Sequence, residues 1–227
     1  MKNKLNILLI NNYFPPEIGA ASHLYFYLAK ELVRRGHKVK VLTGIPRYNV
    51  DLSMYRSYLR MEKVYIEELE EGLEVIRVKL PYVDRKQLIR RGIEHFEISY
   101  KLFSYGKKFL GDVDVSLVYS PPLTLYWVAE KIRKMISSPY ILNVQDLFPQ
   151  EVIDLGLMKN KLLISIFRKI EKKAYESADL ITVHSENNKY YVDNILGKNN
   201  KTFVFENWID DQEIVPGEKN NEFSKRY

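Results

Sequence analysis

The sequence predicts an α/β fold with a Rossmann-like, mostly parallel sheet flanked by helices. Short β-branched or Leu-rich runs alternate with longer segments of helical period along most of the chain. Turn-rich loops containing Pro, Gly or Asn follow several of these short runs. With 227 residues and a hydrophobic fraction of 46%, the chain can bury a core of ordinary size.

The first unit begins with an apolar strand at residues 5–10 and continues through a turn-rich loop into a helix at 22–35. Ser22 is the predicted N-cap of this helix. Gly36 stands where a left-handed residue commonly ends a helix. The predicted apolar stripe of the helix consists of Leu24, Leu28 and Leu32.

The same alternation continues to residue 205. Residues 64–69 and 73–78 predict two strands joined by a tight connection at a Glu-Gly pair, and a helical first arm is the alternative. Residues 88–110 predict a long basic helix. The other predicted strands are 38–43, 113–119, 140–144, 180–183 and 201–205, and the other predicted helices are 123–136, 161–177 and 186–196.

The apolar pattern stops near the end of the chain. From Asp210 onward, Asp, Glu, Asn, Lys and Pro predominate, which is typical of a linker. No internal repeat is visible. We therefore expect one domain at residues 1–208, followed at 209–227 by a linker or the start of another unit.

Composition excludes several kinds of chemistry. Because no cysteine occurs, there is no disulfide, thiolate metal site or thiol nucleophile. The apolar run near the N-terminus is too short for a secretory signal or a bilayer span, so a soluble, cytoplasmic chain is expected. The net charge of +6 favours an anionic partner but is too mixed for a dedicated nucleic-acid binder, so we expect none. Composition alone does not choose between acidic lipid headgroups and diphosphates.

The loops that follow parallel strands gather at one edge of the sheet, where ligands bind in open α/β folds. The first loop carries one glycine, Gly19, and thus neither dinucleotide-binding nor P-loop spacing. Gly19 precedes a helix N-terminus, where it either admits a diphosphate to the backbone or merely allows the turn. The four histidines are dispersed, and neither G-x-S-x-G nor H-E-x-x-H occurs, so no metal site is predicted.

Five stretches together suggest a family. They are 13–20, 28–44, 144–149, 178–185 and 207–210. In their order and spacing they resemble glycosyltransferase family 4, especially transferases of capsule and O-antigen biosynthesis such as N-acetylfucosaminyl transferases. The resemblance implies the N-terminal half of a GT-B enzyme. Residues 1–208 would then be the acceptor-binding domain, and 209–227 would lead into an absent nucleotide-sugar-binding domain.

The resemblance also implies a reaction. Such enzymes transfer a sugar, here expected from a UDP-sugar, to a lipid-linked or saccharide acceptor with retention, and need no cofactor or divalent metal. The leaving diphosphate must be stabilised by positive charge and N–H donors. The paired glutamates of the family's donor domain are not represented, so this chain alone should be a poor catalyst or none. The alternatives are a non-catalytic acceptor-binding subunit of a split transferase and, more distantly, a sugar-phosphate enzyme.

Residues that match the donor side of the family come from two loops. Gly19, Ala20 and Ser22 match the loop that faces the donor phosphates, although Ala20 replaces a usual second glycine. Asp146 matches a carboxylate that bonds a sugar hydroxyl or steadies positive charge at the anomeric carbon, and its alternative role is to cap the following turn. Gln145 stands beside it where many members carry a histidine, and an amide cannot act as a base.

Other matching residues belong to the acceptor side and to the interdomain cleft. A carboxylate and a guanidinium there can bind hydroxyls or phosphate, but each can also be a solvated loop residue. A lone histidine, in turn, more often packs or caps than binds a ligand. The implied acceptor-binding residues are Tyr13, Glu17, His23, Arg47 and Tyr48, and those of the cleft are His184, Ser185, Asn207 and Trp208.

The basic helix at 88–110 is a candidate membrane contact. A basic amphipathic helix can lie on anionic lipid, which would put the protein at the inner face of the cell membrane. The alternative is that its apolar stripe packs on the sheet while its cations are solvated. The predicted stripe is Ile89, Ile93, Phe96, Tyr100, Phe103 and Leu110, flanked by Arg85, Lys86, Arg90, Arg91, Lys101, Lys107 and Lys108.

Overall fold

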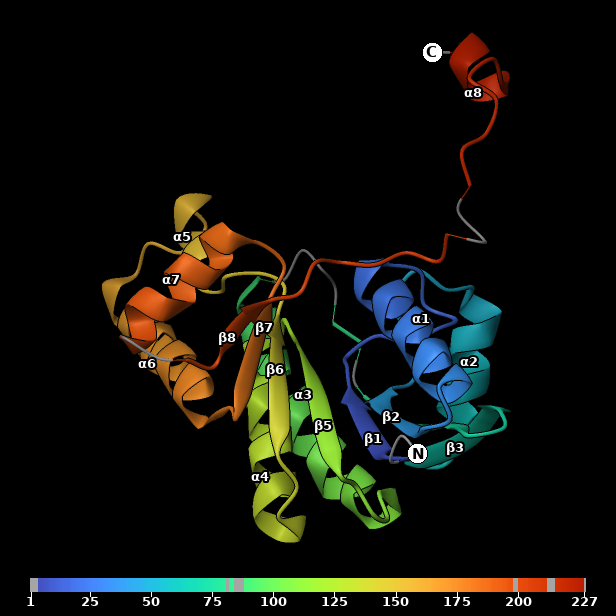
Figure 1. The fold of residues 1–227 in the computed structure, drawn as a ribbon, viewed down its shortest axis with the longest axis horizontal. Coiled ribbons are helices and arrows are strands. Elements are labelled where there is room, and N and C mark those ends of the chain that lie inside the picture. Colours follow the sequence, from blue (N-terminus) through green and yellow to red (C-terminus); the bar gives the residue numbers. More distant parts are fainter. Residues whose placement is uncertain (1–3, 81, 84–87, 198–199, 212–214, 227) are drawn as a thin grey trace.

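The computed structural model describes residues 4–80, 82–83, 88–197, 200–211 and 215–226. These residues form an eight-stranded sheet in the order β3-β4-β2-β1-β5-β6-β7-β8 (Figure 1). Only β3 and β4 pair antiparallel. The strands are β1 (Asn6–Ile10), β2 (Lys38–Gly44), β3 (Val64–Glu70), β4 (Leu73–Val78), β5 (Val115–Ser120), β6 (Tyr140–Val144), β7 (Leu180–Val183) and β8 (Thr202–Val204). The predicted fold class is confirmed, and the predicted strand ends agree within two residues.

Helices cover the sheet from both sides (Figure 1). The α-helices are α1 (Ala20–Arg34), α2 (Leu52–Arg60), α3 (Leu88–Gly106), α4 (Tyr126–Ile136), α5 (Gln150–Asp154), α6 (Lys161–Ser177), α7 (Glu186–Leu196) and α8 (Glu222–Arg226). Two short 3₁₀ helices, η1 (Lys107–Phe109) and η2 (Leu123–Leu125), follow α3 and precede α4. Among the described residues, no helix is both long and apolar enough to cross a bilayer.

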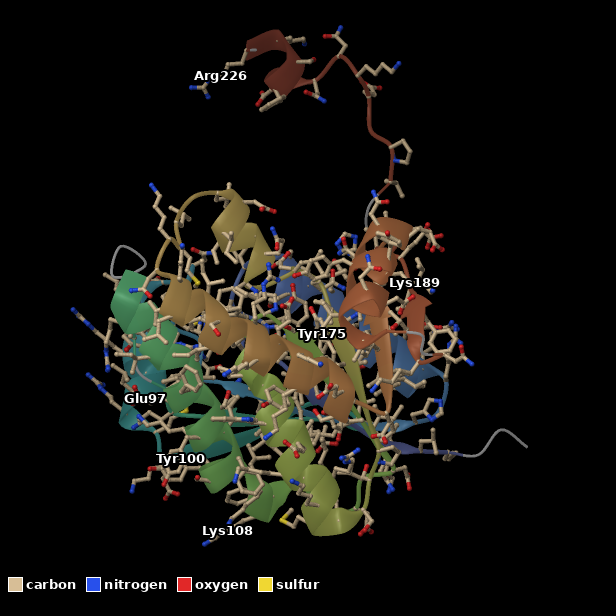
Figure 2. All side chains as sticks on the ribbon, turned by 90° about the vertical axis from the view of Figure 1, so that its left-hand side faces the viewer. Glu97, Tyr100, Lys108, Tyr175, Lys189 and Arg226 are labelled. Atoms are coloured by element: carbon tan, nitrogen blue, oxygen red, sulfur yellow. The ribbon has the colours of Figure 1, made fainter. Side chains whose placement is uncertain are left out.

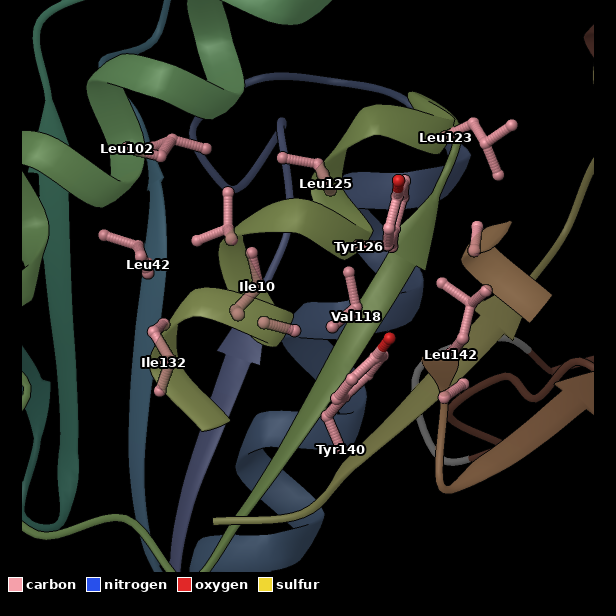
Figure 3. Packing of buried hydrophobic residues seen from close by; sticks show 14 of the residues in the cluster. Ile10, Leu42, Leu102, Val118, Leu123, Leu125, Tyr126, Ile132, Tyr140 and Leu142 are labelled. Atoms are coloured by element: carbon pink, nitrogen blue, oxygen red, sulfur yellow. The ribbon is translucent and has the colours of Figure 1, made fainter. Parts of the chain in front are cut away.

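The alternation of side chains along a strand divides the core into two clusters. On β1, Ile7 and Leu9 join the cluster under α1, while Leu8 and Ile10 join the cluster under α3, α4 and α6. Figure 3 shows the larger cluster, in which Ile10 of β1 lies near Ile132 of α4. Because helices cover both faces of the sheet, its central strands are apolar on both sides. This explains the nearly continuous apolar runs in the sequences of β1 and β6.

Helix α1 begins two residues earlier than predicted. Its N-cap is Gly19, which makes no side-chain capping bond, so the prediction that Ser22 caps the helix is wrong. Ser22 lies inside the first turn and is buried together with Tyr25 and Ala29. These three residues, spaced by three and four, form the face that meets the sheet. Gly36 has φ +90°, which confirms the predicted left-handed residue, whereas the predicted stripe of Leu24, Leu28 and Leu32 is only partly buried.

Helix α3 turns a different face to the core than its apolar spacing predicted. Glu94, Ile98 and Leu102, each four residues apart, are buried. Of the predicted stripe, Ile93 is exposed, and so is Tyr100, which Figure 2 labels. The prediction of a single stripe is therefore wrong, because a glutamate occupies the buried face. Phe96 and Phe103 are partly buried, Leu110 is buried beyond the helix end, and Arg85, Lys86 and the side chains of Ile89 and Arg91 lie outside the described residues.

The sequence did not predict the three short helices α2, α5 and α8. Helix α2 buries no residue, and its beginning is fixed locally by the Asp51 side chain, which accepts a hydrogen bond from the Ser53 N–H. The predicted hairpin is confirmed, with β3 and β4 joined through Gly72 at φ +89°. Helix α8 lies apart from the sheet in Figure 1. The domain boundary after residue 208 stays a prediction.

Candidate functional site

The strands β2, β1, β5, β6, β7 and β8 run parallel, so their carboxyl ends share one edge of the sheet, here called the rim. Backbone bonds join neighbouring strand ends there, from Asn11 N–H to Leu42 O (3.2 Å) and from Gln145 N–H to Ser120 O (2.9 Å). The loops that carry Gly19 and Asp146 therefore emerge at the same edge, with the end of β5 between them.

One group of polar side chains at the rim is buried except for the half-buried Tyr13. We call Asn12, Tyr13, Glu17, Arg47 and Tyr48 the Glu17–Arg47 cluster. Glu17 Oε1 accepts hydrogen bonds from the Arg47 N–H (3.0 Å) and the Tyr48 N–H (3.1 Å). Arg47 Nη2 donates to Asn12 Oδ1 at 2.6 Å. Glu17 and Arg47 are each only 3% exposed. These bonds fasten the loop after β2 to the loop after β1.

The cluster keeps unused hydrogen-bonding capacity. Glu17 Oε2 and the Nε and Nη1 atoms of Arg47 are buried without a partner. The guanidinium lies 5.5 Å from the Tyr13 ring centroid and 5.3 Å from that of Tyr48, within cation–π range. Burial raises the pKa of the Glu17 carboxyl, and Arg47 opposes that rise. A hydroxyl or phosphate group that entered this cluster could form hydrogen bonds with the unpartnered atoms of the guanidinium, and a hydroxyl also with the carboxylate.

The Tyr48 hydroxyl ties the cluster to helix α3. It donates to Val83 O at 2.7 Å and lies 3.1 Å from Glu94 Oε1. Burial raises the pKa of Tyr48 to about 12, so the phenol stays protonated. This contact explains why a glutamate is found on the buried face of α3.

The second group, Tyr119, Asp146, Glu151 and His184, is more open, and we call it the Asp146 cluster. Desolvation raises the pKa of the Asp146 carboxyl, and His184 partly offsets it. Desolvation also raises the pKa of Glu151, and the charge of Asp146 adds to that rise. Burial raises the pKa of Tyr119 in the same way, again with a contribution from Asp146. Although its carboxyl is partly desolvated, Asp146 is exposed at the surface.

The neighbours of Asp146 hold its loop in place. His184 Nε2 lies 3.0 Å from Gln145 O and 3.1 Å from Asn188 Nδ2. Gln145 is buried and its amide donates to Asn143 Oδ1 at 3.0 Å, so its side chain is used within the fold. Ser185 is the N-cap of α7 and accepts from the Asn188 N–H. The Asp146 side chain itself is exposed.

The N-terminus of α1 is open at Gly19. A Cβ built on Gly19 would meet no atom within 4 Å, and its φ of 165° is extended backbone that any residue adopts. The fold alone therefore does not require glycine there. Gly19 and Ala20 are exposed, and below them the hydroxyls of Ser22 and Tyr25 are buried without partners. First-turn N–H groups at such an end attract anions.

Residues 205–211 cross α1. The Trp208 Nε1–H donates to Leu24 O at 2.8 Å, and its ring lies 5.2 Å from the Phe205 ring. Trp208 also borders an apolar hollow of about 300 Å³ between α1 and the strands β5 to β7. Trp208 thus fastens this segment to α1, whereas Asn207 is exposed.

The predicted residues do not all meet. Tyr13, Glu17, Arg47 and Tyr48 come together, but His23 is exposed on α1 with its ring 6.4 Å from Tyr27. Sequence reasoning missed Asn12, Glu94, Tyr119 and Glu151. Two of these residues could have been found from the sequence, because Tyr119 stands at a strand end and Glu151 follows Asp146 by five residues. Nothing in the local sequence indicated Glu94. No group of three His, Asp or Glu side chains suited to a metal ion occurs within the described ranges.

Solved structures show the same fold. The chain superimposes on sucrose-phosphate synthase from Thermosynechococcus elongatus with a TM-score of 0.64 at 16% identity, over 94% of this chain and 51% of that one. The fold is glycosyltransferase-like. A second solved chain of sucrose-phosphate synthase from the same organism matches with a TM-score of 0.53 at 16% identity, over 88% of both chains. The sheet and its helices thus correspond to about half of the first of these two synthase chains.

Sequence comparison adds one curated relative, a probable glycosyltransferase, WbjE, from Pseudomonas aeruginosa. The two are 24% identical over 143 residues, which cover 61% of this chain and 35% of the relative. The matched region is thus about a third of the relative's length. No family model matches the sequence.

Proposed function

We propose that this chain is the acceptor-binding half of a retaining, family 4 GT-B glycosyltransferase. It would serve the transfer of a hexosyl or N-acetylhexosaminyl group from a nucleotide sugar, expected to be a UDP-sugar, to a lipid-linked or saccharide acceptor of surface polysaccharide synthesis. The observation that carries the proposal is the gathering of polar loops at one rim of a sheet that superimposes on half of sucrose-phosphate synthase. The similarity to a probable glycosyltransferase supports it.

Each part of the rim has a role in this proposal. The open α1 N-terminus at Gly19 receives the donor phosphates, because its free N–H groups and helix dipole stabilise negative charge as the glycosyl-phosphate bond breaks. The Asp146 carboxylate bonds a hydroxyl of the donor sugar or steadies the positive charge that develops at the anomeric carbon. The Glu17–Arg47 cluster lies on the acceptor side, where it binds hydroxyl or phosphate groups.

The test is nucleotide release by the full-length protein, incubated with UDP- and GDP-sugars and a lipid-linked acceptor. Asp146→Asn removes the negative charge and keeps the shape, so we expect transfer to fall about 100-fold or more. The matched control is Asp112→Asn, an exposed aspartate beyond the opposite edge of the sheet, before β5, which should leave the rate unchanged. An Asp146→Asn protein that transfers sugar at the wild-type rate would remove Asp146 from the proposed site.

A further inference from the structure

A concentration of exposed aliphatic side chains lies where α5 leads into α6. Leu155 is 65% exposed, Leu157 60%, Leu162 70%, Leu163 46% and Ile166 43%. Single exposed hydrophobic residues are ordinary on a protein surface, but a group of them marks a binding surface. Leu162, Leu163 and Ile166 are neighbours on α6 at spacings of three and four residues. All five fall within residues 155–166, and we call them the α5–α6 patch.

The charged residues within the patch segment have one sign, whereas the exposed acids Glu151 and Asp154 lie just before it on α5. Residues 155–170 contain no Asp or Glu, and Lys159, Lys161 and Lys169 are exposed. Within the described part of the chain, these three lysines form no ion pair. The remaining cation, Arg168, is turned inward and bonds Glu171 at 3.0 Å. The patch therefore joins aliphatic side chains to unneutralised positive charge.

The patch lies at the same end of the molecule as the candidate site. Helix α6 follows β6 in the crossover to β7 and runs back from the rim, so its first turns are at the rim end. The buried residues of α6 are all in its second half, namely Glu171, Ala174 and Tyr175. In its first half, Phe167 contacts Phe148, with ring centroids 5.1 Å apart. Phe148 belongs to the loop that carries Asp146. The first half of α6 therefore packs directly against the loop of the candidate site.

Helix α3 does not offer the same combination, although its sequence suggested a lipid contact. Ile93 and Tyr100 are exposed. The neighbouring cations Arg90 and Lys101, however, both pair with Glu97, at 3.5 Å and 2.9 Å. Glu97 thus offsets one of these two positive charges, whereas no carboxylate pairs with Lys159, Lys161 or Lys169 in the described residues, so the argument from charge favours α6.

We propose that the α5–α6 patch docks on an anionic lipid surface. Aliphatic side chains enter the boundary between headgroups and acyl chains, while lysines pair with lipid phosphates. A second copy of this chain fits less well, because an isologous contact would bring like charges together. The inference deepens the proposed function, since docking through the rim end would bring the acceptor side of the site to lipid-linked acceptors.

The experiment is sedimentation of the full-length protein with vesicles, without nucleotide. Vesicles of phosphatidylcholine with about a third phosphatidylglycerol should bind it, pure phosphatidylcholine should bind it weakly, and added salt should release it. We expect Leu162→Gln with Ile166→Gln to weaken binding at least about tenfold, because aliphatic insertion is lost. Lys159→Gln with Lys161→Gln should also weaken it about tenfold, through lost attraction to the lipid phosphates. The matched control, Ile93→Gln with Tyr100→Gln, should bind as wild type does.

Three outcomes would overturn the inference: no binding to anionic vesicles, unchanged binding by both α6 variants, or loss of binding only in the α3 control. Circular dichroism of each variant identifies any loss of fold. The inference and the proposed function fail separately. Asp146→Asn should lose transfer and keep vesicle binding, whereas the Leu162 and Ile166 variant should lose vesicle binding and keep nucleotide release with a water-soluble acceptor.

Discussion

The two polar groups at the rim are built in opposite ways. In the Glu17–Arg47 cluster, carboxylate and guanidinium are buried, and the bonds they form join two loops. In the Asp146 cluster, the carboxylate is exposed, and the bonds around it belong to its neighbours. Buried charges fix geometry at a cost in desolvation, whereas exposed ones stay available for chemistry. The first group should therefore matter more for folding and the second more for turnover.

The largest effect should come from removing the buried Glu17 carboxyl. Glu17→Ala leaves the backbone N–H groups of Arg47 and Tyr48 without their acceptor, and we expect a loss of about 3 kcal/mol in the free energy of unfolding. Asp146→Ala should change it by no more than about 0.5 kcal/mol, since its side chain is exposed. Urea unfolding of both variants measures the difference. Equal losses would show that the two clusters do not divide the roles in this way.

Two glycines at the rim allow a second comparison. A Cβ on Gly44 would overlap Arg47 Nη1 and approach Leu80 Cδ1 to 2.6 Å, so Gly44→Ala should cost about 2 kcal/mol through overpacking. Gly19→Ala meets nothing within 4 Å and should leave stability unchanged. If donor phosphates approach the backbone at Gly19, the same variant should raise the KM for the nucleotide sugar. Thermal unfolding and donor titration separate the two effects, and an unchanged KM would favour a role in the turn alone.

The smallest effect concerns pH. The pKa of Glu17 is raised above its ordinary value of 4.5, so the folded protein holds this proton more tightly than the unfolded chain does. The stability that Glu17 contributes is full below 4.5 and declines as the pH rises through the folded value. Glu17→Gln should therefore lose less stability than wild type between about pH 4 and about pH 7. Urea unfolding across that range measures both slopes, and parallel slopes would contradict the predicted shift.

Local pattern predicted most of the fold and part of the site. The parallel strands were recognisable because burial on both faces leaves unbroken apolar runs, and the rim follows from parallel pairing. The face of α3 was not predictable, because Glu94 is buried through a contact with Tyr48, which is 46 residues away in the sequence. His23 is exposed on α1, and its expected place on the acceptor side stays a prediction.

The sequence by itself determined the order of strands and helices, the absence of cysteine chemistry, and the loops that would carry polar residues. Each of these depends on residues close together in the chain. Only the tertiary structure decided that Glu17 and Arg47 share a buried cluster and that Tyr119 and Glu151 join Asp146. It also decided that Lys159, Lys161 and Lys169 form no ion pair within the described residues. These depend on which side chains meet after the sheet has formed, and spacing along the chain does not contain that information.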